Sequence, residues 1–362
     1  MEFTVNKKVF NGIINDKDTE IIKSYRYPYE VLYKNDNLKN LVNNNYNDND
    51  YIIIDINVYN LDKSCFNNIK TSHIYFIDAK ESNKTIDTVL VIIDSLIELK
   101  ISKMNKILVI GGGITQDIGG SVSALYKRGI TWWLIPTTLL SMTDSAIGAK
   151  TCLNRTSKNI LGLFYAPEKI LISNYFFNSL SKPDIISGLG EALKLSMIGG
   201  EENVKLFKYY YKNNDYINII KLSNSIKKLI IEYDELEKNE RRVLNYGHTC
   251  GHALEVASNY KIPHGIAVLF GMYIVNVLFY GNNKFEEINI YILDLIPKKF
   301  KGVKIDFKQF KSCLLNDKKN KGTNICFVLL EEYGQSKFVF REFTEIIEAL
   351  KKILLLLFEI RF

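Results

Sequence analysis

Histidine is scarce in this sequence of 362 residues, and cysteine is sparse and irregularly spaced. The chain holds four histidines and five cysteines, and no two cysteines form a C-x-x-C pair. An odd number of scattered cysteines does not suit a disulfide framework, so we expect free thiols in a reducing compartment. The cysteines are Cys65, Cys152, Cys250, Cys313 and Cys326.

Segments typical of secretion, membranes and nucleic-acid binding are also missing. The first residues, M-E-F-T-V-N-K-K, lack the apolar core of a signal peptide, and the apolar run Ile353–Phe358 is far too short to span a bilayer. The net charge of +7 arises from 47 Lys and Arg against 40 Asp and Glu, without a dense basic block. That surplus fits small anionic ligands better than nucleic acid. We therefore expect a cytoplasmic protein without membrane or nucleic-acid partners, long enough for two domains.

Three of the four histidines gather in one short stretch, Asn245–His264. His248 and His252 are four residues apart in a run with an apolar stripe, which predicts that both imidazoles share one helix face. His264 follows a proline and opens a second apolar helical pattern, so we place it in the first turn of that helix.

Two imidazoles on one helix and a third at a neighbouring helix start could form a metal site. A catalytic zinc typically has three protein ligands and one open position. A single helix histidine is usually only a polar residue, but three in one stretch weaken that interpretation. A zinc protease would carry Glu after the first His, where this chain has Thr249, so we do not expect a protease.

The first half of the chain alternates short apolar runs with helical periodicity. Strand, turn and helix in succession predict an α/β fold with a parallel sheet and a ligand at the strand ends. The expected strands are 51–54, 73–77, 106–110, 132–135 and 169–173, with helices at 85–99 and 117–128.

Three glycines, Gly111 to Gly113, follow one of the expected strands. Such a run lets the backbone approach a pyrophosphate at a helix N-terminus. It is not the G-x-G-x-x-G pattern, however, and a simple tight turn explains it about equally well.

From Lys182 onward the pattern becomes helical. We expect two domains, 1–178 with the sheet and 179–362 with mostly helices, because the period of the apolar residues changes between them. The expected helices are 185–198, 203–211, 216–235, 243–258 and 265–280.

Charged residues lie among Gly, Ala and Leu near the histidine stretch, where solvated surface residues would be unusual. Glu191 and Lys194 are three apart on one helix face, and Glu191 is a natural partner for the histidines. We interpret the set as the lining of a polyanion pocket. Its other members are Asp144, Lys150, Lys158, Asn159, Lys227, Glu237, Arg241 and Asn245.

Taken together, these motifs resemble the 3-dehydroquinate synthases and their relatives, the sugar-phosphate cyclases. The resemblance runs from about Tyr51 to Asp317–Lys319 and on to the C-terminal helix, and it is weak before Tyr51. The motifs that carry it are G-G-G-I-T-Q-D-I-G-G, Y-K-R-G-I, I-P-T-T-L-L, D-S-A-I-G-A-K-T, K-N-I-L-G-L-F, G-L-G-E-A-L-K, L-N-Y-G-H-T-C-G-H-A-L-E and P-H-G.

The resemblance implies a Rossmann-like NAD-binding α/β domain, a helical metal-binding domain and a homodimer. It assigns Glu191, His248 and His264 as ligands of a divalent metal, zinc first and cobalt as the alternative. The positions that match the family's cofactor contacts are Asp55, Asn57, Glu81, Lys84, Gly112, Gly113, Ile114, Asp117, Thr137, Thr138 and Lys158.

The resemblance also implies a set of substrate contacts. His252 becomes an acid/base beside the substrate phosphate, and Glu237 matches a carboxylate involved in proton transfer. Arg128 would reach the phosphate across the dimer, and Lys319 or Lys318 would add a contact to it. The remaining matches are Asp144, Lys150, Asn159, Lys194, Lys227, Arg241 and Asn245.

The implied reaction oxidises a ring carbinol transiently, eliminates phosphate, returns the hydride and closes a carbocycle by an intramolecular aldol step. The phosphate itself could remove the proton, so its positioning counts as proximity catalysis. Lys227 and Arg241 suit a carboxylated substrate. We therefore expect 3-dehydroquinate synthase, acting on 3-deoxy-D-arabino-heptulosonate 7-phosphate in the shikimate pathway.

The chain departs from the family pattern at a few positions. Ile266 stands where Glu is common, Ala149 and Cys152 replace glycines, and Thr115-Gln116 precede Asp117 in place of the usual residues. The loop 154–159 is one residue shorter than usual.

Other functions remain open on the sequence alone. A cyclase of secondary metabolism is the main alternative, of the 2-deoxy-scyllo-inosose synthase, amino-dehydroquinate synthase or epi-valiolone synthase type. A metal-dependent alcohol dehydrogenase of the glycerol-dehydrogenase type would share the two-domain plan but leave the phosphate-binding cations unexplained. A non-catalytic scaffold would have no need of the intact ligand set.

Overall fold

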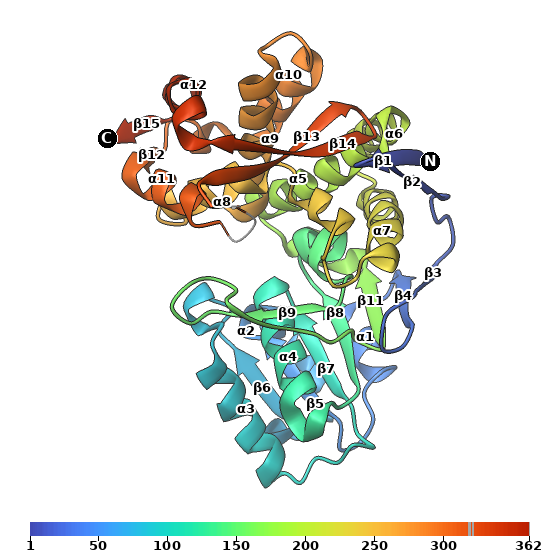
Figure 1. Cartoon of the computed structure of the whole chain (residues 1–362). Helices are drawn as coiled ribbons and strands as arrows, with labels where there is room; N and C mark the ends of the chain where they lie inside the picture. The colour runs from blue at the N-terminus through green and yellow to red at the C-terminus, as the bar shows by residue number, and fades with distance from the viewer. Residues whose placement is uncertain (318–319, 321, 362) are drawn as a thin grey trace. The chain divides into compact units, whose positions relative to one another are not determined.

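The computed structural model describes residues 1–317, 320 and 322–361, which group into two compact units (Figure 1). The sheet unit comprises Asn15–Leu180 and Tyr216–Leu236, and the helical unit comprises Met1–Ile14, Ser181–Asp215 and Glu237–Phe362. The units and the predicted domains both divide the chain near residue 180. They differ in two segments, because residues 1–14 group with the helical unit and residues 216–236 with the sheet unit.

A seven-stranded sheet forms the core of the sheet unit in the part of the chain that the structure describes. Within this sheet β3 and β4 pair antiparallel, and the other neighbouring strands are parallel. Apolar runs such as Y-I-I-I suit these parallel strands, because both of their faces are buried. β5 lies between β6 and β7, so the strand order reverses there. In spatial order the strands are β3 (Thr19–Ile22), β4 (Tyr29–Lys34), β11 (Lys169–Ser173), β8 (Trp132–Pro136), β7 (Ile107–Gly111), β5 (Tyr51–Asp55) and β6 (Ile74–Ile77).

Helices and a hairpin complete the sheet unit. The helix α4 packs closely on β7, because a Cβ atom at Gly119 would lie only 2.5 Å from the Val109 side chain. The helices are α1 (Leu38–Asn43), α2 (Ile56–Tyr59), α3 (Ile86–Glu98), α4 (Gly113–Leu125) and α7 (Tyr216–Tyr233). Strands β9 (Lys150–Leu153) and β10 (Leu161–Phe164) form the hairpin. Short helical segments are η1 (Lys63–Phe66), η2 (Thr71–His73), η3 (Glu81–Asn83), η4 (Tyr126–Arg128), η5 (Ser141–Ser145) and η6 (Asn174–Ser179).

The helical unit is built around α9, whose sequence G-I-A-V-L-F-G-M-Y-I-V is apolar on all sides. A helix of this kind must be buried, and α9 packs against α5, α8, α10 and α12. The helices are α5 (Lys182–Gly199), α6 (Glu201–Lys212), α8 (His248–Ala257), α9 (His264–Tyr280), α10 (Glu286–Leu295), α11 (Phe307–Leu315) and α12 (Phe343–Leu357), with short segments η7 (Glu240–Asn245) and η8 (Lys298–Phe300).

Two small sheets also belong to the helical unit. The first joins the two ends of the chain, because β1 pairs in parallel with β14. Its order is β13 (Asn324–Glu332), β14 (Gln335–Glu342), β1 (Glu2–Val5) and β2 (Lys8–Asn11), and the second pairs β12 (Lys304–Asp306) with β15 (Glu359–Arg361). This β1–β14 pairing explains why the first residues group with the helical unit.

The predicted fold class, a parallel α/β half followed by a mostly helical half, is confirmed. Two predicted helix starts are wrong. The helix expected at 243–258 begins at His248, because Gly247 adopts a left-handed φ of 78° and separates it from η7. The helix expected at 117–128 begins at Gly113 and ends at Leu125. In the described residues we find no helix with the length and hydropathy needed to cross a membrane.

Candidate functional site

Helices α5 and α9 approach each other closely where the predicted ligand Glu191 lies. A Cβ atom at Gly190 would be 2.2 Å from the carbonyl oxygen of Gly265, so only glycine allows this contact. The hydroxyl of Ser187 accepts a hydrogen bond of 3.0 Å from the Gly265 N–H and ties the start of α9 to α5. The crossing therefore brings Glu191 of α5 beside His264, the first residue of α9.

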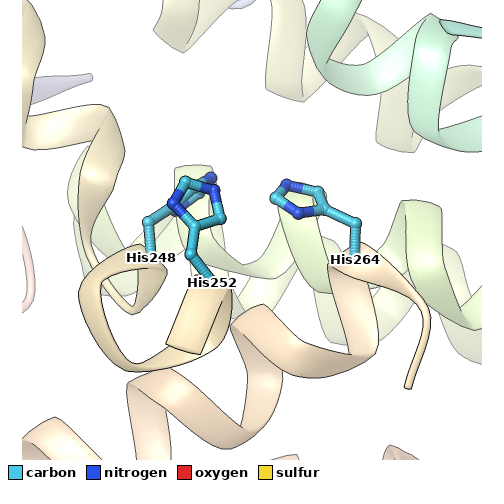
Figure 2. A group of neighbouring side chains, drawn as sticks. All are labelled: His248, His252 and His264. Carbon is cyan, nitrogen blue, oxygen red and sulfur yellow. The ribbon is translucent and has the colours of Figure 1, made fainter. Parts of the chain in front are cut away.

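The other two histidines come from α8. His248 is its first residue, directly after the left-handed Gly247, and His252 follows one turn later as predicted. Figure 2 shows the three rings rising from two helices towards one space. One ring nitrogen from each of His248, His252 and His264 can be chosen so that all lie within 4.8 Å of one another.

Glu191 lies at the centre of the tightest contacts. Its Oε1 is 3.3 Å from Nε2 of His248 and 3.3 Å from Nε2 of His264. This buried oxygen has no well-directed hydrogen bond among the described residues. A tetrahedral zinc with bonds of about 2.0–2.1 Å holds its ligand atoms about 3.3–3.4 Å apart. The two distances from Glu191 Oε1 therefore suit a divalent metal ion. The sequence resemblance implied the same three residues as ligands, and that role stays a prediction.

The second nitrogen of the His248 ring and that of the His264 ring each have a partner. Nδ1 of His248 lies 3.2 Å from the carbonyl oxygen of Tyr246, and Nδ1 of His264 lies 2.9 Å from Oε2 of Glu255. Both partners accept hydrogen bonds, so each ring carries a proton on Nδ1. Nε2 is therefore the nitrogen of each ring that faces Glu191, and it is the atom that would bind a metal once its own proton is displaced.

Charge in this cluster favours an ionised carboxylate. Burial raises the pKa of Glu191, but Lys194 and His248 outweigh it and hold this pKa well below its usual range. The Lys194 ammonium donates to Oε2 of Glu191. Burial and Lys194 lower the pKa of His248. Burial alone would lower the pKa of His264, but Glu255 and Glu191 raise it to about 10.

In the sheet unit, the predicted cofactor residues lie after the carboxyl ends of four adjacent parallel strands, β6, β5, β7 and β8. The strand order reverses between two of them, β5 and β7, which is where parallel α/β sheets bind ligands. The residues are Asp55 at the end of β5 and Asn57 after it, Glu81 and Lys84 after β6, Gly112, Gly113, Ile114 and Asp117 after β7, and Thr137 and Thr138 after β8. The structure brings these ten together at one sheet edge; their contacts with a cofactor stay a prediction.

The glycines at the start of α4 allow close packing there. A Cβ atom at Gly111 would lie 2.5 Å from the Thr115 side chain, and one at Gly112 would lie 2.9 Å from Thr138. Around Gly113 the nearest atom would be 3.6 Å away, so the backbone remains approachable. The first N–H groups of α4 can therefore receive an anionic group such as a pyrophosphate.

Lys84 connects residues from both predicted sets. Its ammonium lies 2.9 Å from Oδ2 of Asp117 and 2.6 Å from Oδ1 of Asn159, and Glu81 is 3.7 Å away. Burial raises the pKa of Asp117, with Lys84 acting against it. The loop between β9 and β10 is thus anchored to α4 through its predicted substrate residue Asn159. Lys158, in the same loop, is half-buried.

Asp144 belongs to η5, a π-helical turn of the kind often found at functional sites. Lys227 of α7 donates to its carboxylate at 2.8 Å. The next residue, Ser145, forms two hydrogen bonds with the side chain of Gln116 at the start of α4, at 2.7 and 2.9 Å. These contacts fix η5 against the start of α4.

The remaining predicted residues are placed as follows. Asn245 donates to Glu237 at 3.0 Å, and Arg241 is buried nearby in η7. Lys150 opens β9 and is half-buried. Arg128 is exposed at the end of η4. Lys319 lies outside the described residues.

Sequence reasoning missed Glu255 and undervalued Gln116. Glu255 stands three residues after His252 in H-A-L-E, so a carboxylate on the ligand helix was a usable signal. Gln116 was noted only as a departure from the family pattern, and its pairing with Ser145 depends on a tertiary contact that no spacing reveals.

Comparison with known proteins gives a consistent result across the chain. The family model for the 3-dehydroquinate synthase N-terminal region matches residues 74–187, and the model for its C-terminal region matches residues 188–320. A 3-dehydroquinate synthase from Pelagibacter ubique is 36% identical over 283 residues, which cover 72% of this chain and 76% of that protein.

Solved structures agree on the fold. A crystal structure of 2-deoxy-scyllo-inosose synthase with carbaglucose-6-phosphate, NAD+ and Co2+ has a TM-score of 0.78 and 22% identity, covering 92% of this chain and 99% of that one. The 2-epi-5-epi-valiolone synthase of Streptomyces hygroscopicus subsp. jinggangensis, with NAD+ and Zn2+ bound, has a TM-score of 0.76 and 24% identity, covering 90% and 96%. Identities this low support the fold alone. With two adjoining family models spanning residues 74–320 and a relative 36% identical over three quarters of its length, this chain belongs to the 3-dehydroquinate synthase family.

Proposed function

We propose that this chain is an NAD- and metal-dependent sugar-phosphate cyclase, and specifically a 3-dehydroquinate synthase. It would convert 3-deoxy-D-arabino-heptulosonate 7-phosphate to 3-dehydroquinate and phosphate. The observation that carries the proposal is the convergence of Glu191 Oε1 with Nε2 of His248 and His264 at 3.3 Å, in a chain of this family.

The divalent cation would be held by Glu191, His248 and His264. Zinc is our first choice of cation, because two imidazoles and a carboxylate are ligands typical of zinc. When bound, such a cation polarises a carbinol oxygen, and NAD bound at the strand ends supplies a transient hydride acceptor. Lys194 keeps Glu191 ionised. His252, on the same helix face as His248, is placed to hold or move a proton near the ligand set.

The cofactor would lie along the carboxyl ends of β5, β7 and β8. Its pyrophosphate suits the start of α4, where Gly113 leaves the backbone open. Asp55, which ends β5, is placed to accept hydrogen bonds from a ribose. Glu81, Lys84 and the other predicted cofactor residues follow neighbouring strands.

The substrate would be bound by cations and amides. Lys150 and His252 suit its phosphate, and Lys227 and Arg241 suit its carboxylate. Both Lys227 and Arg241 are buried, which strengthens their attraction for an anion relative to a solvated side chain. Oriented in this way, the departing phosphate can accept the proton from the carbon beside the new ketone.

We further propose a cytoplasmic homodimer in which Arg128 serves the partner's phosphate site. Lys127 and Arg128 both adopt positive φ, 50° and 65°, and such strain is retained where a side chain must be presented in one direction. On the β9–β10 hairpin, Leu161, Leu163 and Phe164 are exposed, and a second copy could cover them.

The test is phosphate release by the purified protein with NAD and zinc. Three substrates are offered separately: the seven-carbon heptulosonate phosphate, sedoheptulose 7-phosphate and glucose 6-phosphate. Release from the heptulosonate alone, without net NADH, is the expected result. Glu191→Gln should abolish it, whereas Glu202→Gln, the same change at an exposed residue of α6, should not.

A cyclase of secondary metabolism is the second candidate, favoured by the departures at Ile266 and Ala149. Phosphate released only from an uncarboxylated sugar would establish it and remove 3-dehydroquinate synthase. Net NADH from an alcohol without phosphate release would instead indicate a metal-dependent dehydrogenase.

A further inference from the structure

Glu255 lies at the edge of the metal-ligand cluster and has no role in the proposed reaction so far. It belongs to the last turn of α8, three residues after His252, and only 4% of its surface is exposed. Its Oε2 lies 2.9 Å from Nδ1 of His264, the nitrogen that faces away from Glu191. Its carbonyl oxygen accepts the Tyr260 N–H at 2.7 Å, which anchors this end of the helix.

We propose that Glu255 is a positioning residue for the divalent cation, acting through His264. The carboxylate accepts a hydrogen bond from the Nδ1–H group and so fixes both the tautomer and the plane of the ring. Nε2 is then held facing the position of the cation beside Glu191. Negative charge on Glu255 also makes the imidazole a stronger electron donor to a cation. This inference rests on the metal site of the proposed function.

The two ligand histidines differ in how they are oriented. Nδ1 of His248 is held by a backbone carbonyl, that of Tyr246, which no side-chain substitution removes. Nδ1 of His264 is held by a side chain. The His264 side chain is also the more exposed, at 26% against 10% for His248, so packing restrains it less. Its orientation therefore depends more on one hydrogen bond, and Glu255 supplies it.

The experiment measures the zinc affinity of the full-length protein by competition with a chromophoric chelator. Glu255→Ala should weaken zinc binding by about 100-fold and Glu255→Gln by about 10-fold, the range seen when the outer partner of a ligand histidine is changed. Glutamine loses less because its amide oxygen can still accept the Nδ1 proton. The visible absorption of the cobalt-substituted protein should change in both variants, because the geometry around the metal changes.

Thr249→Val is the matched control. Thr249 is buried on the same helix and donates to the carbonyl oxygen of Cys326 at 3.0 Å. Loss of this hydrogen bond should disturb the packing of α8 and leave the zinc affinity unchanged. If Glu255 only stabilised the helix, the Glu255 variants and Thr249→Val would have the same zinc affinity.

Each outcome has a distinct meaning. Native zinc affinity in folded Glu255→Ala and Glu255→Gln would overturn this inference and leave the proposed function standing. An equal loss in Thr249→Val would overturn it as well, because the effect would then be one of helix packing. Failure of the wild-type protein to bind zinc would remove the metal site and the proposed function with it. If Glu255→Ala does not fold, the zinc affinity and the cobalt absorption spectrum of Glu255→Gln test the inference in its place.

Discussion

Replacing Gly190 by alanine should move two proposed metal ligands, Glu191 and His264, apart without changing either side chain. The new Cβ atom would lie 2.2 Å from the carbonyl oxygen of Gly265 and 2.9 Å from its carbonyl carbon. Real contacts of this kind begin above about 3 Å, so α5 and α9 must move apart by about 1 Å. Glu191 follows Gly190 and His264 precedes Gly265, so their separation of 3.3 Å should grow to about 4 Å or more.

The expected loss of unfolding free energy in Gly190→Ala has two parts. Overpacking of a tight contact costs about 1–3 kcal/mol, from which alanine's better helix propensity returns about 1 kcal/mol. The second part appears only with metal. If the wider spacing raises the zinc dissociation constant about 100-fold, the stabilisation that saturating zinc confers should shrink by about 2.7 kcal/mol.

Urea unfolding of the metal-free and zinc-loaded proteins separates the two parts. Gly119→Ala is the control, because its Cβ would also clash, at 2.5 Å from Val109, but within the sheet unit. The control should lose stability equally with and without zinc, whereas Gly190→Ala should lose more with zinc. Gly190→Ala that folds and keeps its native zinc stabilisation would refute the argument that this helix crossing sets the ligand spacing.

Three further predictions concern the sheet unit. Ala149 has a left-handed φ of 61°, which costs about 1–2 kcal/mol, and glycine's added chain entropy takes back about 0.5–1 kcal/mol, so Ala149→Gly should stabilise the protein by about 0.5–1 kcal/mol. Unchanged urea midpoints would contradict this. Burial raises the pKa of Glu20, although Lys228 opposes the shift, so the stability linked to its proton is complete at acid pH and is lost as pH rises through the folded pKa. Glu20→Gln should therefore be more stable than wild type at neutral pH only, and an equal offset at every pH would refute the burial argument. Mixing inactive Arg128→Ala and Lys150→Ala subunits should restore about a quarter of wild-type phosphate release if Arg128 acts across a dimer, and no recovery would place it in its own subunit's site.

The sequence was sufficient for elements whose signal is local. The run K-I-L-I-S predicted its strand at 169–173, and the apolar pattern after Pro263 placed His264 at a helix start. The β1–β14 pairing was beyond reach, because residues more than three hundred positions apart have no shared periodicity. The early start of α4 was missed for a different reason: three glycines indicate a turn as readily as a helix N-terminus.

The clustering of three histidines with Glu191 could be predicted, because the histidine spacing and the residue types are visible in the sequence. Which of these residues bind a metal was implied by the family resemblance and stays a prediction. The distances between their side chains could not be predicted, since these depend on the backbone contact between Gly190 and Gly265. The same limit applies to Glu255, whose partner His264 lies across a helix turn and a proline. Spacing identifies which side chains can bind a metal; the crossing of backbones decides whether they meet.

The predicted division between cofactor and substrate residues is less sharp in the structure than in the sequence. Lys84 was assigned to the cofactor and Asn159 to the substrate, yet they share a hydrogen bond of 2.6 Å. Asp117, a third member, holds the same ammonium at 2.9 Å and also accepts the Cys152 N–H at 3.0 Å. A lysine ammonium has three protons to donate, and the hydrogen bonds to Asn159 and Asp117 use two of them. The third proton can point to a cofactor while Lys84 still holds Asn159, so one lysine could link the cofactor to the loop and the two sets of residues would act as one.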